Sequence, residues 1–142
     1  MAPGRPTEHD PNIDLATRLF AAWSSGDVDA PGEFLHPDAV LHDIVGGEHR
    51  GWPSIREFFG NGLKVWRDLV LAPEQFWTSD DGVAVNWVMS ATVPESMANA
   101  FGSHNVGKKW RSEGMSWLRI VDGLVVREVD YHDSGAAKRS LA

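Results

Sequence analysis

The sequence predicts an α+β fold in which helices come first and a strongly curved, mainly antiparallel sheet follows. Apolar residues recur every three or four positions up to Trp66, which is the period of a helix, and about every two positions after it, which is the period of a strand. Turn signals at residues 79–82 and at Asp122-Gly123 divide the second half into antiparallel strands. We therefore expect three N-terminal helices on a curved sheet, with a conical cavity between them.

The first helix is predicted to begin at Pro11. Asp10 can accept hydrogen bonds from the free backbone N–H groups of the first turn, and a proline at the first helical position has no N–H to leave unpaired. Gly26 is the predicted end of this segment. The apolar face at helical spacing consists of Ile13, Ala16, Phe20 and Trp23.

Two further helical segments and one strand complete the first half. Residues 31–35 predict a short helical turn, and residues 39–45 predict a short strand that two glycines break. The third helix is predicted to open at residues 52–54, where a proline occupies the first turn. Its apolar face consists of Ile55, Phe59, Leu63 and Trp66.

The second half is predicted to consist of strands. Residues 69–78 predict a strand in which Pro73 marks an edge or a bulge, because proline cannot donate to a strand ladder. In the next strand the odd positions are more fully apolar than the even ones. The remaining predicted strands are residues 83–93, 108–121 and 124–133, with a looser insertion at residues 94–107.

The chain of 142 residues fits a single domain. We expect a disordered leader over residues 1–10, one α+β domain over residues 11–135 and a polar tail over residues 136–142. The N-terminal residues lack the apolar stretch of a signal peptide, and no run of about 18 apolar residues predicts a membrane span. The sequence therefore predicts a soluble, cytoplasmic protein without a membrane partner.

Composition excludes several classes of function. The chain has 13 Lys and Arg against 20 Asp and Glu, for a net charge of −7, and its basic residues form no long run. Nucleic-acid binding needs a clustered basic surface, so a nucleic-acid partner is not expected. The lack of cysteine excludes disulfides, thiolate catalysis and cysteine-ligated metal centres. Seven Trp and six His favour an apolar pocket with a few titratable groups.

The last predicted strand carries the strongest chemical signal. Strand alternation puts Glu128, Asp130 and His132 on one face, together with Val126. Buried carboxylates are costly unless they are paired, so this face is either solvated or lines a cavity in which the groups pair. In a cavity, Asp130 and His132 could form a proton-shuttling pair.

Asp43 is the second acid–base candidate. It lies where the first predicted strand meets a glycine turn, beside His42, and adjacent strand residues point to opposite faces. One hypothesis makes Asp43 a base whose pKa is raised by surrounding Trp and Phe side chains. The other makes it a turn residue that accepts hydrogen bonds from backbone N–H groups.

Other side chains could contact a substrate. Small polar residues within apolar strands suit hydrogen bonds to ligand oxygens, although backbone or water is their more common partner. Aromatic residues on the helical faces either line the pocket or belong to the core. Trp87 and Trp117 are predicted on the outer face of the sheet, at a dimer interface. The candidate substrate-binding residues are His42, Asn86, Ser112, Ser116, Glu128 (nearer the rim), Phe20, Trp23, Phe59 and Trp66.

The sequence does not predict a metal or nucleotide site. His36, His42 and His49 lack the His-x-x-x-His spacing of a helical site and the His-x-His spacing of a strand site. The glycines within residues 46–47 and 60–62 lack the strand-to-helix context of a dinucleotide site. We therefore expect neither a metal nor an organic cofactor.

Three segments together resemble a known family. They are the first helix running into residues 25–27, residues 34–43 with residues 51–59, and residues 117–123 with residues 127–133. These segments are similar to those of the nuclear-transport-factor-2-like superfamily, and within it to the SnoaL-like polyketide cyclases and the ketosteroid isomerases. The resemblance implies a cone-shaped α+β barrel, usually a homodimer, with a ligand pocket between sheet and helices and acid–base chemistry without a cofactor.

Some functional residues of these families are matched in this sequence and others are not. Asp43 matches the general base of the ketosteroid isomerases, but Leu19 and Ser116 occupy the positions of their oxyanion-hole Tyr and Asp, so steroid isomerisation is not expected. Asp130 matches an acidic residue on the last strand of the SnoaL-like cyclases and of the limonene-type epoxide hydrolases. Residues 83–93 lack the Arg and Asp that the epoxide hydrolases also need.

The leading hypothesis is a cofactor-independent acid–base enzyme of the cyclase or isomerase type, acting on an apolar or polycyclic small molecule in natural product biosynthesis. The predicted catalytic residues are Asp130, which moves a proton next to a carbonyl, and its partner Asp43 or His132. The alternative is a non-catalytic dimeric module that binds a small molecule or a protein. The third hypothesis is a dehydratase or other lyase, or an epoxide-hydrolase-like enzyme, with His132 or His42 as the main base.

Overall fold

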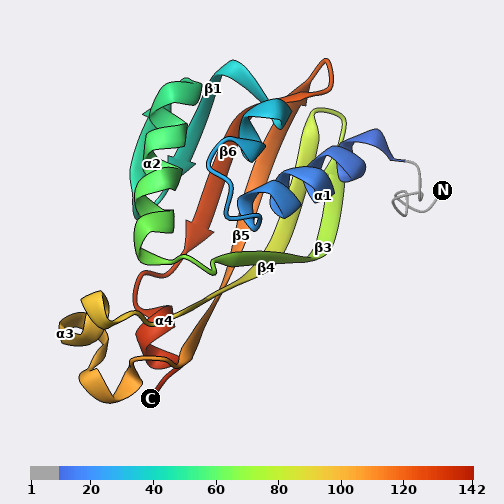
Figure 1. Ribbon diagram of the computed structural model, residues 1–142. Helices are drawn as coiled ribbons and strands as arrows, with labels where there is room; N and C mark the ends of the chain where they lie inside the picture. Colours follow the sequence, from blue (N-terminus) through green and yellow to red (C-terminus); the bar gives the residue numbers. More distant parts are fainter. Residues whose placement is uncertain (1–9) are drawn as a thin grey trace.

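The computed structural model describes residues 10–142, so all but the last residue of the predicted leader lies outside the described residues. Two main helices pack on a six-stranded sheet (Figure 1). In chain order, the elements are α1 (Pro11–Trp23), η1 (Ala30–Phe34), β1 (Leu35–Asp43), β2 (Gly47–Arg50), α2 (Trp52–Val65), β3 (Val70–Ser79), β4 (Gly82–Thr92), η2 (Glu95–Met97), α3 (Ala98–Phe101), η3 (Ser103–Asn105), β5 (Lys109–Val121), β6 (Leu124–His132) and α4 (Ala136–Arg139).

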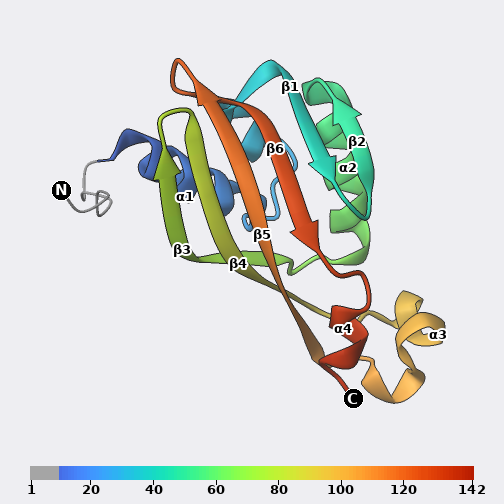
Figure 2. The same cartoon turned by 180° about the vertical axis from the view of Figure 1, so that it is seen from behind.

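The sheet is mixed and open. Its strand order is β2-β1-β6-β5-β4-β3, with β1 parallel to β6 and the other neighbouring strands antiparallel. α1 and α2 lie on the same side of the sheet, which stands in front of them in the view from behind (Figure 2). The predicted α+β class is confirmed, with one difference. Because β2 and β3 are the two edges, the sheet is not a closed barrel.

The first helix begins as the sequence predicts. The Asp10 side chain accepts hydrogen bonds from the backbone N–H groups of Asn12 and Ile13, at 2.9 and 3.2 Å, and caps α1. The helix ends at Trp23, three residues before Gly26, which adopts a φ of 75° in the following loop. The side chains that α1 buries against the sheet are Ala16, Leu19, Phe20, Ala22 and Trp23.

Three segments differ from the sequence prediction. The strand expected over residues 39–45 begins earlier, at Leu35, and its glycine turn leads into β2, which the prediction read only as a break. The insertion over residues 94–107 contains the short helical segments η2, α3 and η3. Residues 136–142, expected as a polar tail, contain α4, and Leu141 packs against a small apolar cluster at the ends of β4 and β5.

Strand signals in the second half agree with the structure. β3 is an edge strand, and its register with β4 shifts between Pro73 and Gln75, so that the proline marks both an edge and a bulge. Asp122 and Gly123 both have positive φ, 51° and 79°, as a tight hairpin turn with this twist requires. In β6, the register with β5 shifts near the turn, and Val125 rather than the predicted Val126 is fully buried.

Trp87 contradicts its predicted place on the outer face of the sheet. Odd positions of β4 face α1, so Trp87 is 2% exposed and belongs to the main core. Its ring lies over Gly114 of β5, where an added Cβ atom would overlap the ring carbons. Trp117 of β5, which lies opposite Ala84 of β4, points to the outer face and is half-buried. The alternation of β4 alone does not say which of its faces the helices cover.

We expect Gly114→Ala to destabilise the fold by about 1–3 kcal/mol, because its methyl group overlaps the buried Trp87 ring. Chemical denaturation followed by circular dichroism measures this change. Gly62→Ala is the matched control, since a Cβ there meets no atom within 4 Å and alanine favours the helix α2. Equal stability of the two variants would contradict the close packing of Trp87 on β5.

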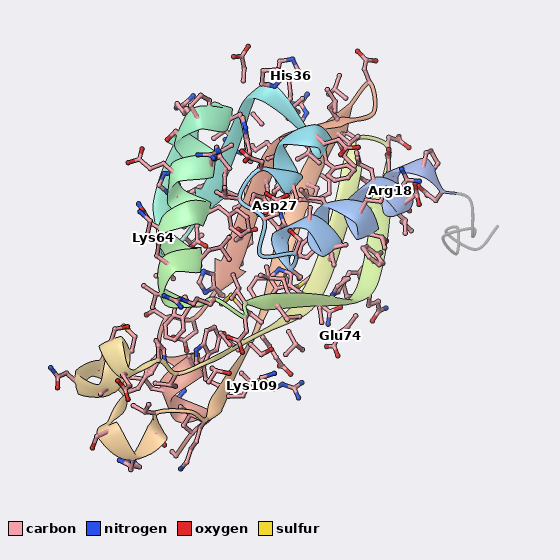
Figure 3. The ribbon with its side chains drawn as sticks, in the orientation of Figure 1. Arg18, Asp27, His36, Lys64, Glu74 and Lys109 are labelled. Atoms are coloured by element: carbon pink, nitrogen blue, oxygen red, sulfur yellow. The ribbon has the colours of Figure 1, made fainter. Side chains whose placement is uncertain are left out.

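The charged residues lie mainly on the outside of the molecule. Arg18 on α1, Lys64 on α2 and Glu74 on β3 extend into solvent (Figure 3). Within residues 10–142, no helix has the length and apolar character needed to cross a bilayer.

Candidate active site

A cavity of about 380 Å³ lies between α2, the end of α1 and the inner face of the sheet. Most of its wall is apolar, and its titratable side chains come from the neighbouring strands β1 and β6. The lining residues are Trp23, Leu41, Asp43, Val45, Gly46, Phe58, Phe59, Asn61, Gly62, Trp66, Leu69, Leu71, Met89, Glu128, Asp130 and His132.

Parallel pairing of β1 with β6 brings the acid–base candidates together. Asp43 lies opposite Asp130 in the register of the two strands. Glu128, Asp130 and His132 share the inner face of β6, as strand alternation predicts. All three predicted catalytic residues therefore meet on one wall of an otherwise apolar cavity.

His132 and Asp43 form an ion pair. The Nε2 atom of His132 lies 2.9 and 3.0 Å from the two carboxylate oxygens of Asp43, and both side chains are largely buried. The Asp43 carboxylate holds the pKa of His132 above its ordinary value, which favours the charged imidazole. His132 is thus paired with Asp43 and not, as the sequence suggested, with Asp130.

Asp43 combines the two roles that the sequence left open. It lines the cavity, and its Oδ1 atom also accepts hydrogen bonds from the backbone N–H groups of Val45 and Gly46, at 2.9 and 2.8 Å. Burial alone would raise its pKa, but the hydrogen bonds from His132 and from this turn outweigh burial and hold the pKa below its usual value. Asp43 is therefore a carboxylate that orients His132 and fixes the turn.

Asp130 is buried at the floor of the cavity, with 8% of its surface exposed. The Ser116 hydroxyl donates a hydrogen bond of 2.6 Å to its Oδ1 atom, and Ser116 accepts a bond of 2.8 Å from the indole N–H of Trp87. Burial raises the pKa of Asp130, while hydrogen bonds from Glu128 and Ser116 oppose this effect. The result is a desolvated carboxyl group of increased basicity.

Glu128 lies deeper than the sequence predicts. It was expected nearer the rim, but it is 2% exposed, and the indole N–H of Trp23 donates a hydrogen bond of 3.2 Å to its Oε1 atom. Burial, followed by the charge of Asp130, raises its pKa well above the ordinary value. Two interacting carboxyl groups therefore lie side by side at the base of the cavity.

Aromatic rings form much of the apolar wall. Of the predicted aromatic residues, Trp23, Phe59 and Trp66 line the cavity, and the rings of Trp23 and Phe59 meet edge to face at 4.8 Å. Phe58 also lines it and stacks on His49 at 4.1 Å. Phe58 is not among the predicted residues, because it lies beside the four residues that define the apolar face of α2 at helical spacing.

Five predicted substrate-binding residues do not line the cavity. Phe20 is fully buried in the core, and Ser116 lies behind Asp130. Ser112 is buried on β5 beyond the cavity wall. His42 and Asn86 point to the outer face of the sheet, because their strand neighbours at odd positions face inward. The structure therefore places these five residues in the core or within the sheet, outside the cavity wall.

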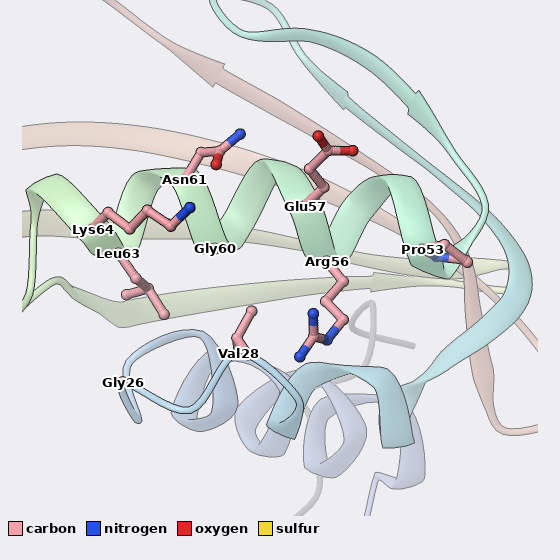
Figure 4. A pocket seen from close by; sticks show the side chains of 9 residues that line it. All are labelled: Gly26, Val28, Pro53, Arg56, Glu57, Gly60, Asn61, Leu63 and Lys64. Atoms are coloured by element: carbon pink, nitrogen blue, oxygen red, sulfur yellow. The ribbon is translucent and has the colours of Figure 1, made fainter.

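A second hollow lies on the other side of α2, facing the loop after α1 (Figure 4). It has a volume of about 460 Å³, and Arg56, one of its two basic lining residues, forms an ion pair with Asp29 at 2.6 Å. None of the buried acid–base groups of β1 and β6 lines it, so the cavity at the sheet is the candidate active site. The second hollow is lined by Gly26, Val28, Pro53, Arg56, Glu57, Gly60, Asn61, Leu63 and Lys64.

Across residues 10–142, no cluster of three or more His, Asp or Glu is arranged to hold a metal ion.

Comparison with known proteins identifies similar chains. The family model of the SnoaL-like domain matches residues 16–128. No curated protein matches the chain significantly.

Three solved structures have a similar fold. A candidate polyketide cyclase from Acidithiobacillus ferrooxidans has a TM-score of 0.82 and 18% identity, over 95% of this chain and 96% of that chain. IdmH, a candidate polyketide cyclase from Streptomyces antibioticus, has a TM-score of 0.77 and 21% identity, over 94% and 99%. A hypothetical protein of ketosteroid-isomerase-like fold from Catenulispora acidiphila, in complex with trimethylamine, has a TM-score of 0.78 and 14% identity, over 89% and 91%. At these identities the likeness shows the fold alone.

Proposed function

The chain belongs to the SnoaL-like domain family, and from this we propose that it is a cofactor-independent acid–base enzyme that moves a proton next to a carbonyl group of an apolar or polycyclic small molecule. One observation carries the proposal. Four titratable side chains, Asp43, Glu128, Asp130 and His132, converge on one wall of an apolar, aromatic-lined cavity. Burying such groups is costly, and an acid–base site gives them a use.

In the proposed reaction, Asp130 is the general base. A carboxylate without water around it is more basic than one in solution, and the pKa of Asp130 is raised by burial. It removes a proton from the carbon next to the carbonyl, and the electron pair of that C–H bond moves toward the carbonyl oxygen to form an enolate. The same first step serves cyclisation and isomerisation.

His132 is the proposed acid. Its pairing with Asp43 favours the charged imidazole, and the Nε2–H group is engaged in that pair. A charged imidazole carries a second N–H group, at Nδ1. An N–H of this cation can stabilise the enolate oxygen or protonate it. Asp130 and His132 therefore supply an acceptor and a donor at one end of the cavity.

The cavity supports the proposed class of substrate. Its volume of about 380 Å³ and its Trp and Phe walls suit a flat, apolar ring system whose carbonyl end approaches β6. Two structures of similar fold are described as candidate polyketide cyclases. The assignment to cyclisation, rather than isomerisation or loss of water, is part of the proposal.

Hydrogen exchange into D₂O tests the first step without knowledge of the natural product. The probes are two polycyclic ketones. α-Tetralone has an exchangeable CH2 group next to its carbonyl, and anthrone has an acidic CH2 group that is conjugated to its carbonyl through the aromatic rings. We expect the protein to accelerate their deuterium uptake, measured by NMR, and the ketones to quench tryptophan fluorescence, because Trp23 and Trp66 line the cavity. Quenching without accelerated exchange of either ketone would favour the non-catalytic binding module.

The outer face of the sheet is the proposed homodimer interface. Trp77 on β3, Met115 on β5 and Tyr131 on β6 are between 41% and 53% exposed, and Trp117 lies beside them. Exposed apolar side chains gathered on one face commonly mark a contact surface. The homodimer that the family resemblance implies would cover this face.

We expect Met115→Glu to convert a dimer into a monomer, because a second copy would have to desolvate the new carboxylate on an apolar face. Light scattering coupled to size-exclusion chromatography measures the change in mass. Arg18→Glu, on the exposed side of α1, is the control and should leave the mass unchanged. A wild type that elutes as a monomer, or a dimer that persists in the Met115 variant, would contradict this interface.

A further inference from the structure

The reaction proposed above uses Asp130 and the Asp43–His132 pair but leaves Glu128 without a part. Glu128 and Asp130 are two residues apart on the inner face of β6, both are almost fully buried, and the nearby Asp130 carboxyl group is one cause of the raised pKa of Glu128. A hydrogen bond between two carboxyl groups needs a proton on one of them. Two ionised carboxylates at this distance in a buried site would also repel each other strongly. Their burial side by side therefore favours a state in which the pair holds one proton.

The surrounding hydrogen bonds place that proton on Glu128. The Ser116 hydroxyl accepts the Trp87 N–H, so its own proton points to Asp130, over the short distance of 2.6 Å. Short O–H···O bonds of this kind favour an ionised acceptor. Glu128 receives only the longer, 3.2 Å bond from the neutral indole of Trp23, on Oε1. That bond suits the carbonyl oxygen of a neutral acid and leaves Oε2 to carry the proton.

Charges on the neighbouring elements also favour a neutral Glu128 and an ionised Asp130. On β6, the cation of His132 lies nearer to the charge of Asp130 than to that of Glu128, and it stabilises the ionised form of Asp130. From β1, the Asp43 carboxylate disfavours a negative charge on Glu128. From α1, Glu128 meets the uncharged Trp23 side chain. An ionised Glu128 would thus have two anions near it and no direct cationic partner among these groups.

We propose that Glu128 is a positioning residue that keeps its proton and donates it in a hydrogen bond to Asp130, so that Asp130 stays the ionised base although it is buried. Glu128 acts through Asp130 and does not itself exchange a proton with the substrate. The assignment of Asp130 as base rests on the proposed function, whereas the protonation of Glu128 does not. The two can therefore be tested separately.

The first test measures protonation through stability and needs no substrate. Between about pH 4.5, near the ordinary pKa of a glutamate, and the higher pKa of folded Glu128, the folded chain binds more protons than the unfolded chain. Stability from this group is therefore lost as pH rises through that window. Glu128→Gln cannot titrate, so the wild type should become less stable relative to this variant, by up to about tenfold in the unfolding equilibrium constant per pH unit.

Denaturant unfolding of both proteins between pH 4.5 and pH 8.5 (about the range that most folded domains tolerate) measures this ratio. Glu74→Gln is the matched control, because Glu74 is solvent-exposed on β3 and its replacement should leave the ratio to the wild type flat with pH. A flat ratio for Glu128→Gln as well would show that folded Glu128 ionises like a solvated carboxyl group, and this would overturn the proposal whatever the enzyme does.

The second test uses the deuterium exchange of α-tetralone and anthrone. Glutamine has the shape of neutral glutamic acid, accepts from Trp23 and donates to Asp130, so Glu128→Gln should retain most of the exchange rate. Glu128→Leu removes the donor and should lose about tenfold or more. At high pH the wild type should lose rate as Glu128 ionises beside Asp130, whereas Glu128→Gln should keep its rate.

The outcomes of the second test are distinct. If Glu128→Gln loses as much rate as Asp130→Asn, Glu128 exchanges protons itself and the positioning role is wrong. If Asp130→Asn retains full rate, the proposed function fails, but the pH dependence of stability still decides whether Glu128 is neutral. Retained rate in Glu128→Gln together with a pH-dependent stability ratio supports both proposals.

Discussion

Replacing Asp130 by asparagine is expected to lower the rate of proton abstraction by about 10²–10⁴-fold while the fold remains intact. Asparagine keeps the size of the side chain and an oxygen that can accept the Ser116 hydroxyl, so the packing around β6 is preserved. It cannot take up a proton at neutral pH. The loss therefore measures the basicity of Asp130 and not its contribution to the cavity's shape.

Deuterium exchange of the polycyclic ketones measures this loss, and circular dichroism with denaturant unfolding checks the fold. Asp38→Asn is the matched control, because Asp38 lies on β1 with its side chain exposed to solvent, outside the cavity. The control should retain the wild-type rate. If Asp130→Asn binds the ketones and exchanges their deuterium like the wild type, Asp130 is not the base, and His132 becomes the candidate base.

The second large effect is expected from Asp43→Asn. Asparagine can still accept the backbone N–H groups of Val45 and Gly46, so the turn is retained, but the charge facing His132 is lost. Because the Asp43 contact is the largest cause of the raised pKa of His132, that pKa should fall toward 6.5. At neutral pH most of the imidazole would then be uncharged, which alone lowers the rate by about fourfold. Because Asp43 also orients the ring, the total loss of exchange rate should be about tenfold or more.

The pH dependence of Asp43→Asn distinguishes this explanation from simple misfolding. The alkaline limb of its rate profile should move to lower pH, and NMR titration should report the same shift for the His132 ring. A rate profile that drops uniformly at every pH, with the His132 titration unchanged, would contradict the role of Asp43 in keeping His132 charged.

Stability should follow the same ion pair. The folded pKa of Asp43 lies below 3.8, so its share of the stability is present above about pH 4 and is lost as pH falls through the folded value. The folded pKa of His132 lies above 6.5, so its share is present below that value and is lost as pH rises through the folded pKa. The wild type should exceed Asp43→Asn in stability most clearly between these limits, by about 1–3 kcal/mol.

The acid–base wall depends on contacts between distant parts of the chain. His132 meets Asp43 across 89 positions, and Trp23 meets Glu128 across 105 positions. β6 is central to this arrangement because it lies between β1 and β5 in the sheet. Its inner face places three titratable groups in a row, and the parallel neighbour β1 adds Asp43 at the height of Asp130.

Local patterns in the sequence determined much of the fold. The Asp10-Pro11 start of α1, the apolar face of α2, the edge position of Pro73 and the Asp122-Gly123 hairpin all follow from the geometry of a few neighbouring residues. The shared face of Glu128, Asp130 and His132 follows from the two-residue period of a strand in the same way. These features depend only on residues that are close together in the chain, so they can be predicted from the order of the residues.

Only the tertiary structure decided which strand faces look inward and which distant residues meet. Alternation placed Trp87 on one face of β4 and Asn86 on the other, but the packing of α1 chose which of them is buried. The packing of α2 on β1 likewise leaves His42 on the outer face of the sheet, and Ser116 lies behind Asp130. The pairing of Asp43 with His132 needs β1 and β6 to close into a parallel pair, and the free energy of that closure comes from burying the whole core rather than from either segment.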